Sequence, residues 1–486
     1  MTRTSSRRPR RLVAGAVLAL ALRGPGTAFA QTAGATVTVN AVRMLALASA
    51  LASAACTMMA PVPSPPAFNL APGTTIIQGD PVELVLSGLT ANARVEIIAA
   101  RRFRADGPLL TSAAVFVADE KGRIDIAHDA PVSGSYAGAD AGGLFWSMTP
   151  VQTPAEPWPA PAVRLTANTS GKMLAETSLQ LVSGRSDTEI IPLDGFPGAK
   201  LYRPAGATPA PVVIILGGSE GGDAAGRRFG PKLAAHGLAA VSLPYFSPET
   251  PKGQEVPGLP VDHVDIPIDR LDALHTALMA RTDIDAAHSG LFGGSKGSEY
   301  ALLAASHFDW IKAVVAYVPS DLVWEGFSAN RLLDPGKHSS YTFRGEPVAF
   351  VPFAGLDKVF AAGSKPNLGL AYEAGRTTHP DRVAAARIPI ERSKSAVLLI
   401  AGENDKMWPS AQMSRNIKTT RDKVGLTTQL MIFPGAGHLV SGDGYTAISY
   451  EGPYQLGGSL AVDAPAQNRA WLAAIKFLRA ELDAAD

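Results

Sequence analysis

The chain has 486 residues, of which 46% are hydrophobic and 18% charged, and its formal net charge is +1. This length is enough for two domains with a sizeable apolar core. The near-zero net charge gives no reason to expect nucleic acid or an anionic surface as a partner, so the charge balance does not indicate a function.

Residues 1–56 have the features of an export segment. Arginines at positions 7, 8, 10 and 11 precede an apolar run at 12–22, and Ala28-Phe29-Ala30 matches a signal-peptidase cleavage site. The run is too short to be a stable transmembrane anchor. We therefore predict an exported protein whose folded part lies in the periplasm or cell envelope.

A second apolar run, 44–55, ends at Cys56, the only cysteine in the sequence. No intramolecular disulfide is therefore possible. Small residues before a cysteine are typical of a bacterial lipoprotein processing site, which predicts a membrane tether through lipidated Cys56. The alternative is a free thiol in a disordered tail. Because one protein has no need of two export signals, we expect translation to start between residues 37 and 44.

Residues 57–72 are rich in proline and small side chains, which predicts an extended linker. From 73 to 188 the sequence consists of short alternating strands, such as 82–86, 95–99, 114–117 and 179–182, separated by glycine, proline and aspartate turns. No helical period of useful length interrupts them. This pattern predicts an antiparallel, immunoglobulin-like β-sandwich domain.

From 189 to 486 strands alternate with helical stretches, which predicts an α/β domain with a mostly parallel, doubly wound sheet. An apolar strand at 211–216 runs into a glycine-rich loop at 217–222, Gly-Gly-Ser-Glu-Gly-Gly. The loop has neither the G-K-[ST] of a phosphate loop nor the G-x-G-x-x-G spacing, so nucleotide binding is rejected. We predict instead that the backbone N–H of Ser219 or Glu220 contributes to an oxyanion hole.

The most informative segment is Gly293-Gly294-Ser295-Lys296-Gly297, which follows a short apolar run and precedes an Ala/Leu-rich helical stretch. A G-x-S-x-G turn between a strand and a helix raises its serine above a parallel sheet, where a histidine can reach it. Ser295 is therefore the predicted nucleophile, and the Lys296 amide the second oxyanion donor. The Lys296 side chain is expected to point to solvent or pair with Glu299, the alternative being a catalytic lysine.

Two further groups follow predicted strands in the order Ser, acid, His that an α/β-hydrolase requires. Asp405 comes just after the strand 397–402, and His438 follows the strand 429–433 and a glycine-rich loop. Because the carboxyl ends of parallel strands meet at one edge of a sheet, we expect Ser295, Asp405 and His438 to form a catalytic triad.

The stretch from about 321 to 392 breaks the alternation of strands and helices, which predicts a lid insert. It contains aromatic residues that would either form the core of the insert, the reading we favour, or line an acyl pocket. No metal or cofactor is expected, because the sequence has no His/Cys cluster with ligand spacing.

These residues resemble the acyl-CoA thioesterase and bile acid-CoA:amino acid N-acyltransferase family. The segments 134–140 (Gly-Ser-Tyr-Ala-Gly-Ala-Asp) and 143–148 (Gly-Leu-Phe-Trp-Ser-Met) are similar to signatures of its N-terminal domain. The loop 217–222, the nucleophile segment, and the segments 388–391, 402–410 and 435–438 are similar to its catalytic domain. The resemblance covers about 66–480.

The resemblance implies a β-sandwich joined to an α/β-hydrolase domain that cleaves acyl thioesters, with a small-molecule acyl-CoA as substrate. It also assigns the nucleophile, acid and base to Ser295, Asp405 and His438. Its amino-acid transferase members use a cysteine nucleophile, so a serine here favours hydrolysis over acyl transfer. The segment after His438 lacks the family's proline-rich continuation.

Two alternatives stay open at this point. Coenzyme A is a cytoplasmic thiol, whereas the amino terminus predicts export, so the protein could be an exported carboxylesterase acting on oxygen esters. The other alternative is a surface binding module whose hydrolase domain is inert.

Overall fold

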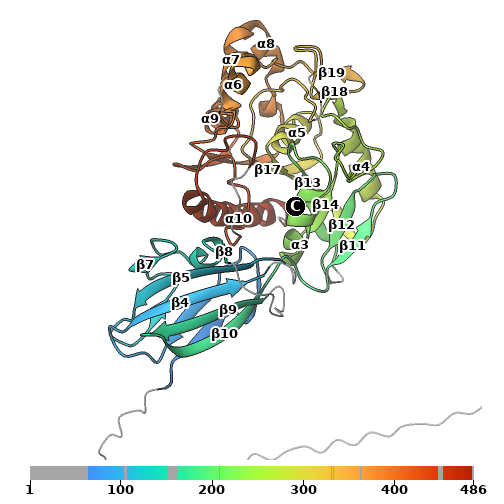
Figure 1. Ribbon diagram of the computed structural model, residues 1–486. Coiled ribbons are helices and arrows are strands. Elements are labelled where there is room, and N and C mark those ends of the chain that lie inside the picture. Colours follow the sequence, from blue (N-terminus) through green and yellow to red (C-terminus); the bar gives the residue numbers. More distant parts are fainter. Residues whose placement is uncertain are drawn as a thin grey trace, which may run out of the picture. The chain divides into compact units, whose positions relative to one another are not determined.

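The computed structural model describes residues 64–102, 107–151, 162–206, 208–329, 331, 333–361, 364–446 and 452–483. The predicted export segment 1–56, Cys56 and residues 57–63 lie outside these ranges. Residues 64–486 form one compact unit. Within it, the strands up to residue 182 pair among themselves, and so do those from residue 189 onward (Figure 1).

The amino-terminal part of this unit contains two β-sheets that face each other across an apolar core. The smaller sheet has the order β1-β3-β6, from β1 (Ala67–Ala71), β3 (Glu83–Ser87) and β6 (Ile124–Asp125). The larger sheet has the order β2-β10-β9-β4-β5-β7, with β8 paired to β5. Its strands are β2 (Thr75–Ile77), β4 (Arg94–Arg101), β5 (Leu109–Val117), β7 (Ser133–Gly134), β8 (Thr149–Val151), β9 (Ala162–Thr169) and β10 (Lys172–Val182).

Three details of this sandwich differ from the sequence prediction. β1 lies in the predicted linker, because Phe68 and Leu70 alternate with Ala67 and Asn69, and this period of two lets the larger side chains pack on the core. A one-turn helix, α2 (Gly143–Trp146), interrupts the strands. β2 is also unexpected in pairing parallel to β10, whereas the other pairs of the sandwich are antiparallel.

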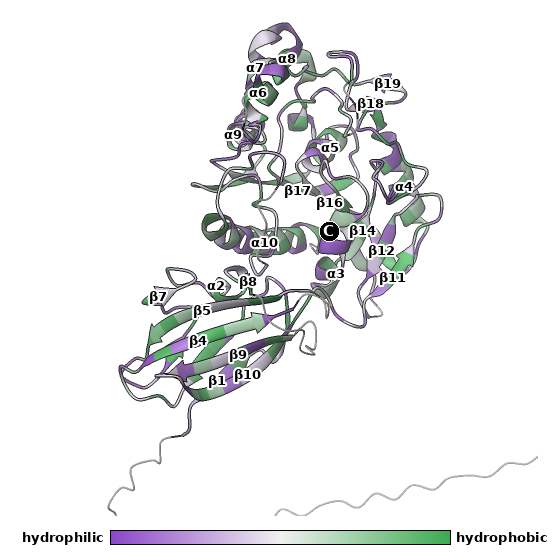
Figure 2. Ribbon diagram, viewed as in Figure 1, coloured by the Kyte–Doolittle hydropathy of each residue, from purple (hydrophilic) through white to green (hydrophobic). Residues whose placement is uncertain are grey.

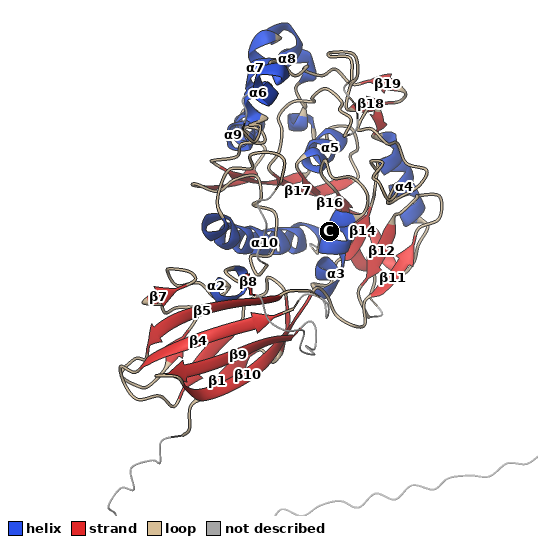
Figure 3. Cartoon of the chain, viewed as in Figure 1, coloured by secondary structure: helices blue, strands red, loops and turns tan. Residues whose placement is uncertain are grey.

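The carboxyl-terminal part is built on an eight-stranded sheet with the order β11-β12-β14-β13-β16-β17-β20-β21. Only the pairs made by β12 are antiparallel, so the predicted mostly parallel sheet is confirmed. Figure 3 shows strands in red and the surrounding helices in blue. The strands are β11 (Glu189–Pro192), β12 (Lys200–Arg203), β13 (Ala210–Leu216), β14 (Ala239–Ser242), β16 (Ile284–Gly294), β17 (Ile311–Tyr317), β20 (Ala396–Gly402) and β21 (Thr428–Phe433).

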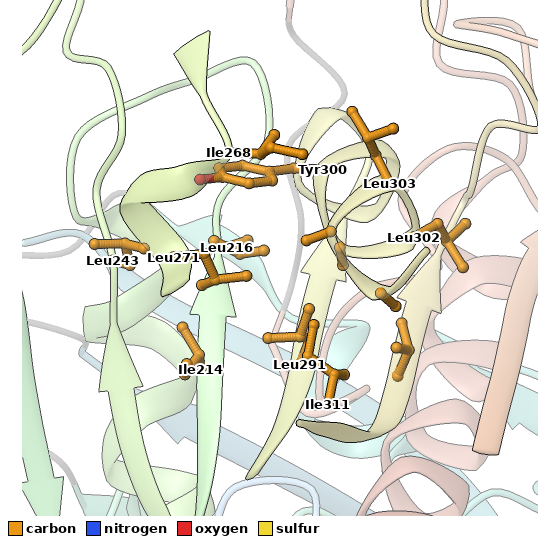
Figure 4. Packing of buried hydrophobic residues seen from close by; sticks show 14 of the residues in the cluster. Ile214, Leu216, Leu243, Ile268, Leu271, Leu291, Tyr300, Leu302, Leu303 and Ile311 are labelled. Atoms are coloured by element: carbon orange, nitrogen blue, oxygen red, sulfur yellow. The ribbon is translucent and has the colours of Figure 1, made fainter. Parts of the chain in front are cut away.

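Helices cover both faces of this sheet. One face packs on α4 (Asp269–Met279), α5 (Lys296–Ala305) and α9 (Ser410–Asp422). Figure 4 shows apolar residues of α4 and α5 against the strands. The other packs on α3 (Ala224–Ala235) and α10 (Leu460–Leu482), where green and purple residues alternate in Figure 2 because one side of each helix faces the core. The strands between them are apolar on both sides, as in buried parallel sheets.

The predicted insert supplies two strands of a short sheet and a few helices. β18 (Tyr341–Phe343) pairs with β15 (Ile266–Pro267) and β19 (Glu346–Pro347). The helices are α6 (Leu356–Ala361), α7 (Gly369–Thr378), α8 (Pro380–Ala386) and η1 (Ile390–Arg392). Trp324 is fully buried in a cluster made mostly of insert residues, as expected for a core of the insert. Tyr341 is fully buried too, but in the main core beneath the hydrolase sheet. In the described ranges no helix is both long and apolar enough to cross a bilayer.

A histidine on α3's carboxyl-terminal side connects the hydrolase part to the sandwich. The Nδ1 of His236 lies 2.7 Å from the carbonyl oxygen of Lys232, and its Nε2 lies 2.8 Å from Asp80 Oδ1. Both partners accept hydrogen bonds, so both ring nitrogens must carry protons. Burial lowers the pKa of His236, but the bonds to Asp80 and Lys232 outweigh it, and the pKa is raised above 6.5.

This arrangement predicts a pH-dependent stability. Since the folded pKa of His236 is raised, its stabilising contribution is complete below the unfolded pKa and is lost as the pH rises through the folded pKa. We expect the stability difference between wild type and His236→Gln, measured by urea unfolding, to be larger at about pH 6 than at about pH 9. An equal difference at both pH values would contradict a charged His236.

Candidate active site

Ser295 lies at a sharp turn between β16 and α5. Its φ of 54° and ψ of −121° are strained for a residue with a side chain, and its N–H donates to the carbonyl of Tyr317 (3.0 Å). Such a turn directs the serine hydroxyl away from the sheet and leaves the first amides of α5 free of intrahelical acceptors.

Two glycines make this turn possible. A Cβ on Gly293 would lie 2.3 Å from the Gly297 carbonyl oxygen, and a Cβ on Gly297 would lie 2.2 Å from the Leu216 carbonyl oxygen. Both contacts are with backbone atoms, which cannot move aside independently. The turn therefore requires glycine at both ends of the pentapeptide, as the sequence pattern indicated.

Asp405 follows β20 in a loop that holds its carboxylate in place. The side chain is 1% exposed and accepts hydrogen bonds from the Ser410 hydroxyl (2.6 Å) and the Met407 amide (2.9 Å). These donors fix the carboxylate's orientation and stabilise its charge. Ser410 belongs to the segment 402–410 that resembles the family, and nothing in its spacing predicts this hydrogen bond.

His438 follows β21 and bridges the other two residues. Its Nδ1 lies 2.9 and 3.0 Å from the two carboxylate oxygens of Asp405, and its Nε2 lies 3.1 Å from Ser295 Oγ. An ionised carboxylate can only accept, so Nδ1 carries the proton and Nε2 presents a lone pair to the hydroxyl. The structure thus brings together the three residues predicted from the order of the strands.

The indole of Trp408 supports the imidazole from one side. Its ring lies edge-on to that of His438, with centroids 6.1 Å apart, and its Nε1 donates to the Val318 carbonyl (3.1 Å). Val318 has a φ of 43°, which is strained for a β-branched residue. This strained residue at the end of β17 therefore helps to position the tryptophan beside the histidine.

The glycine-rich loop after β13 lies against the nucleophile. A Cβ on Gly218 would lie 3.3 Å from Ser295 Cβ, so Gly218 is the loop residue in close approach. Ser219 and Glu220 are exposed, and the Glu220 carboxylate accepts the N–H of Gly218 (3.0 Å). The Tyr245 hydroxyl donates to the Gly217 carbonyl (2.5 Å). Donation by the Ser219 or Glu220 amide to an oxyanion stays a prediction, whereas the Glu220 side chain has a role that the sequence did not suggest.

The Lys296 side chain is buried, although its amide lies at the start of α5 beside the nucleophile. Its Nζ donates to Glu299 Oε2 (2.7 Å) and to Ser340 Oγ in the insert (2.9 Å), and its carbonyl accepts the Tyr341 hydroxyl (2.8 Å). Of the two expectations for this side chain, pairing with Glu299 is correct and exposure to solvent is wrong. Burial lowers the pKa of Lys296 and raises that of Glu299, so each charge depends on the other.

Removing one partner of this pair is expected to be costly. Lys296→Met leaves the Glu299 carboxylate buried without its cation, which should lower the free energy of unfolding by about 3–5 kcal/mol in a denaturant titration. The double variant Lys296→Met/Glu299→Gln keeps an acceptor for the Trp324 amide (3.1 Å) and should lose less than the two single variants summed. Simple additivity would contradict the coupling.

Within the described residues no group of three or more His, Cys, Asp or Glu side chains is placed to hold a metal ion. The sheet order, the serine turn and the hydrogen-bonded Ser295, His438 and Asp405 define an α/β-hydrolase. Asp405 follows β20, which is the neighbour of β17 in the sheet, and His438 follows β21, the edge strand beside β20.

Comparison with known proteins gives the family. Residues 79–192 match the model of the acyl-CoA thioester hydrolase/BAAT N-terminal region, and residues 277–484 match the BAAT/acyl-CoA thioester hydrolase C-terminal model. The chain belongs to this family and is an enzyme.

Relatives match over most of both chains. Acyl-coenzyme A thioesterase 5 of Mus musculus is 27% identical over 439 residues, covering 84% of this chain and 94% of the relative. Acyl-coenzyme A amino acid N-acyltransferase 2 of Mus musculus is 24% identical, covering 83% and 95%. Among solved structures, carboxyl esterase 2 of Tuber melanosporum has a TM-score of 0.37 at 17% identity, covering 62% of this chain and 89% of that one.

Proposed function

We propose that this enzyme is a serine hydrolase that cleaves acyl thioesters through an acyl-enzyme on Ser295. The observation that carries the proposal is the hydrogen-bonded series from Ser295 Oγ through His438 to Asp405, with distances of 3.1 and 2.9 Å. The thioesterase relatives support acyl-CoA as the substrate class. No other group among the described residues needs to be invoked for the chemistry.

In the first half of the reaction, His438 Nε2 takes the proton of Ser295 while Oγ attacks the acyl carbonyl. Asp405 keeps the imidazole in the correct tautomer and stabilises its cationic form. The N–H of Lys296 and one N–H of the loop 217–222 stabilise the oxyanion, each donor contributing about 3 kcal/mol. The imidazolium then returns its proton to the leaving sulfur, and the free thiol departs.

In the second half, water attacks the acyl-enzyme. His438 accepts a proton from the water, the hydroxide adds to the carbonyl, and the tetrahedral intermediate collapses to the carboxylic acid with the proton returned to Ser295 Oγ. A serine acyl-enzyme is an oxygen ester, which water cleaves readily with base assistance. Hydrolysis is therefore favoured over transfer to an amino acid.

We also propose that the enzyme acts outside the cytoplasm, in the periplasm or cell envelope, with Cys56 as a lipid attachment site. The support is the sequence of residues 1–56 alone. Mass spectrometry of the mature amino terminus tests this. A chain that begins at lipidated Cys56 supports it, and a full-length, unmodified chain in the cytoplasm overturns it.

The substrate class is tested by comparing kcat/KM for acyl-CoA with kcat/KM for nitrophenyl esters of equal acyl length. Preference for the thioester supports the proposal. Preference for oxygen esters, which an extracytoplasmic location would favour, makes the protein a carboxylesterase. If the enzyme leaves every activated ester intact and a fluorophosphonate probe fails to label Ser295, the protein is an inert binding module.

A further inference from the structure

The segment that follows His438, residues 439–446, is held by both halves of the compact unit. We call it the His438 loop. Lys232 of α3 forms a buried ion pair with Asp443, the two side chains being 3% and 4% exposed. Asn468 of α10 donates to the carbonyls of Asp443 (3.0 Å) and of Gly79 in the sandwich (2.8 Å). The loop is therefore bound to two helices of the hydrolase, and through Asn468 it is tied to the sandwich.

The sandwich also packs directly against this loop. Tyr445 is 1% exposed and belongs to the hydrophobic core of the sandwich, not to that of the hydrolase sheet. Its ring centroid lies 5.3 Å from that of Phe145 in α2. A Cβ on Gly142 would lie 2.9 Å from the Gly444 carbonyl oxygen and 3.0 Å from the Tyr445 ring. The sandwich thus leaves the loop no room to move toward it.

Because the loop begins directly after His438, the contacts that hold the loop also restrict the position of the imidazole. The proton transfer needs His438 Nε2 at its 3.1 Å from Ser295 Oγ. An eight-residue loop without such contacts would let the imidazole drift, and a displacement of about 1 Å costs about 10²-fold in rate. The signature segment 143–148 of the sandwich lies at the point where it can prevent this drift.

We infer that the β-sandwich is a positioning element of the active site, in which Phe145 and Gly142 hold the His438 loop and thereby the imidazole. The inference rests on the proposed function, because it assigns the sandwich a part in the same proton transfer. It distinguishes the sandwich from an independent ligand-binding module, which could be altered without changing the chemical step.

The test uses two phenylalanines of one core. Phe145→Ala removes the ring that contacts Tyr445. Phe116→Ala removes an equally buried ring, on β5. Phe116 is opposite Val95 of β4, and Val95 lies six residues (101 minus 95), or about 20 Å, along that strand from Arg101. Arg101 lies near the Ala99–Ser112 pair of β4 and β5, and the Ser112 hydroxyl donates to the Leu144 carbonyl of α2 (2.5 Å), which places this end of the strands beside α2. We expect both variants to lose stability, but only Phe145→Ala removes a ring that contacts the His438 loop.

We expect Phe145→Ala to lower kcat for thioester hydrolysis, and the rate of fluorophosphonate labelling of Ser295, by about tenfold or more with KM unchanged. Phe116→Ala should keep the wild-type kcat per folded molecule, with the folded fraction measured by circular dichroism. Phe145→Leu, which keeps bulk against Tyr445, should recover most of the lost rate. Equal kcat in Phe145→Ala and wild type would overturn the inference, as would an equal loss in Phe116→Ala.

A second variant protects the test if Phe145→Ala does not fold. Gly142 has φ −85° and ψ −8°, which alanine adopts without strain, so Gly142→Ala only pushes a methyl against Gly444 and Tyr445. Gly73→Ala is the control, because a Cβ there meets nothing within 4 Å. We expect a lower kcat in Gly142→Ala alone, and unchanged kcat in both would overturn the inference. Failure of the proposed function would appear differently, as a wild-type protein without thioesterase activity or Ser295 labelling.

Discussion

Ser295→Ala is expected to lower kcat for thioester hydrolysis by about 10⁶-fold, to the residual level supplied by binding and the oxyanion donors. The variant lacks the oxygen that forms the acyl-enzyme, and His438 then has no hydroxyl to deprotonate. The unfolding midpoint should change little, since a methyl group replaces a hydroxymethyl at a backbone turn fixed by its glycines. Steady-state kinetics and fluorophosphonate labelling of the intact protein provide the measurement.

Ser289→Ala is the matched control for this variant. Ser289 lies in the same strand, β16, is fully buried, and donates its hydroxyl to the Ala286 carbonyl (2.7 Å). Its loss should cost about 1 kcal/mol of stability and leave kcat unchanged. If Ser295→Ala still turned over or were still labelled, another residue would have to be the nucleophile.

Asp405→Asn is expected to lower kcat by about 10⁴-fold. The asparagine amide can donate to His438 Nδ1, which favours the tautomer whose proton is on Nε2. Nε2 then has no lone pair with which to accept the proton of Ser295. The shape of the site is retained, so KM should stay close to the wild-type value. Asp422→Asn, at an exposed ion pair with Lys418 in α9, is the control and should behave as wild type. A loss below about tenfold in Asp405→Asn would mean that another group orients the imidazole.

The parts of the structure that follow from local pattern were predictable. Apolar runs gave the buried strands β13, β16, β20 and β21, and their order placed Ser295, Asp405 and His438 on one edge of the sheet. Each of these predictions depends on residues that are adjacent in sequence or on a rule of chain topology. The catalytic geometry follows from the same rules, because the carboxyl ends of parallel strands converge.

Other features depend on partners hundreds of residues away, and no local pattern contains them. Tyr445 gives no sign in the sequence that it packs in the core of a domain ending near residue 188. Lys232 and Asp443 are ordinary charged residues until the fold buries them together. The hydrogen bond from the Gly218 amide to the Glu220 carboxylate is local, but a glycine-rich loop predicts only its backbone donors and not where the glutamate side chain turns.

The contact between Phe145 and Tyr445 joins residues that are 300 positions apart (445 minus 145). Contacts of such long sequence separation form late, because the chain entropy lost in closing the loop must first be offset by the structures on both sides. Both halves of the molecule therefore have to reach their native topology before the imidazole is seated. In a refolding experiment we therefore expect enzymatic activity to appear no earlier than the packing of Phe145 against Tyr445.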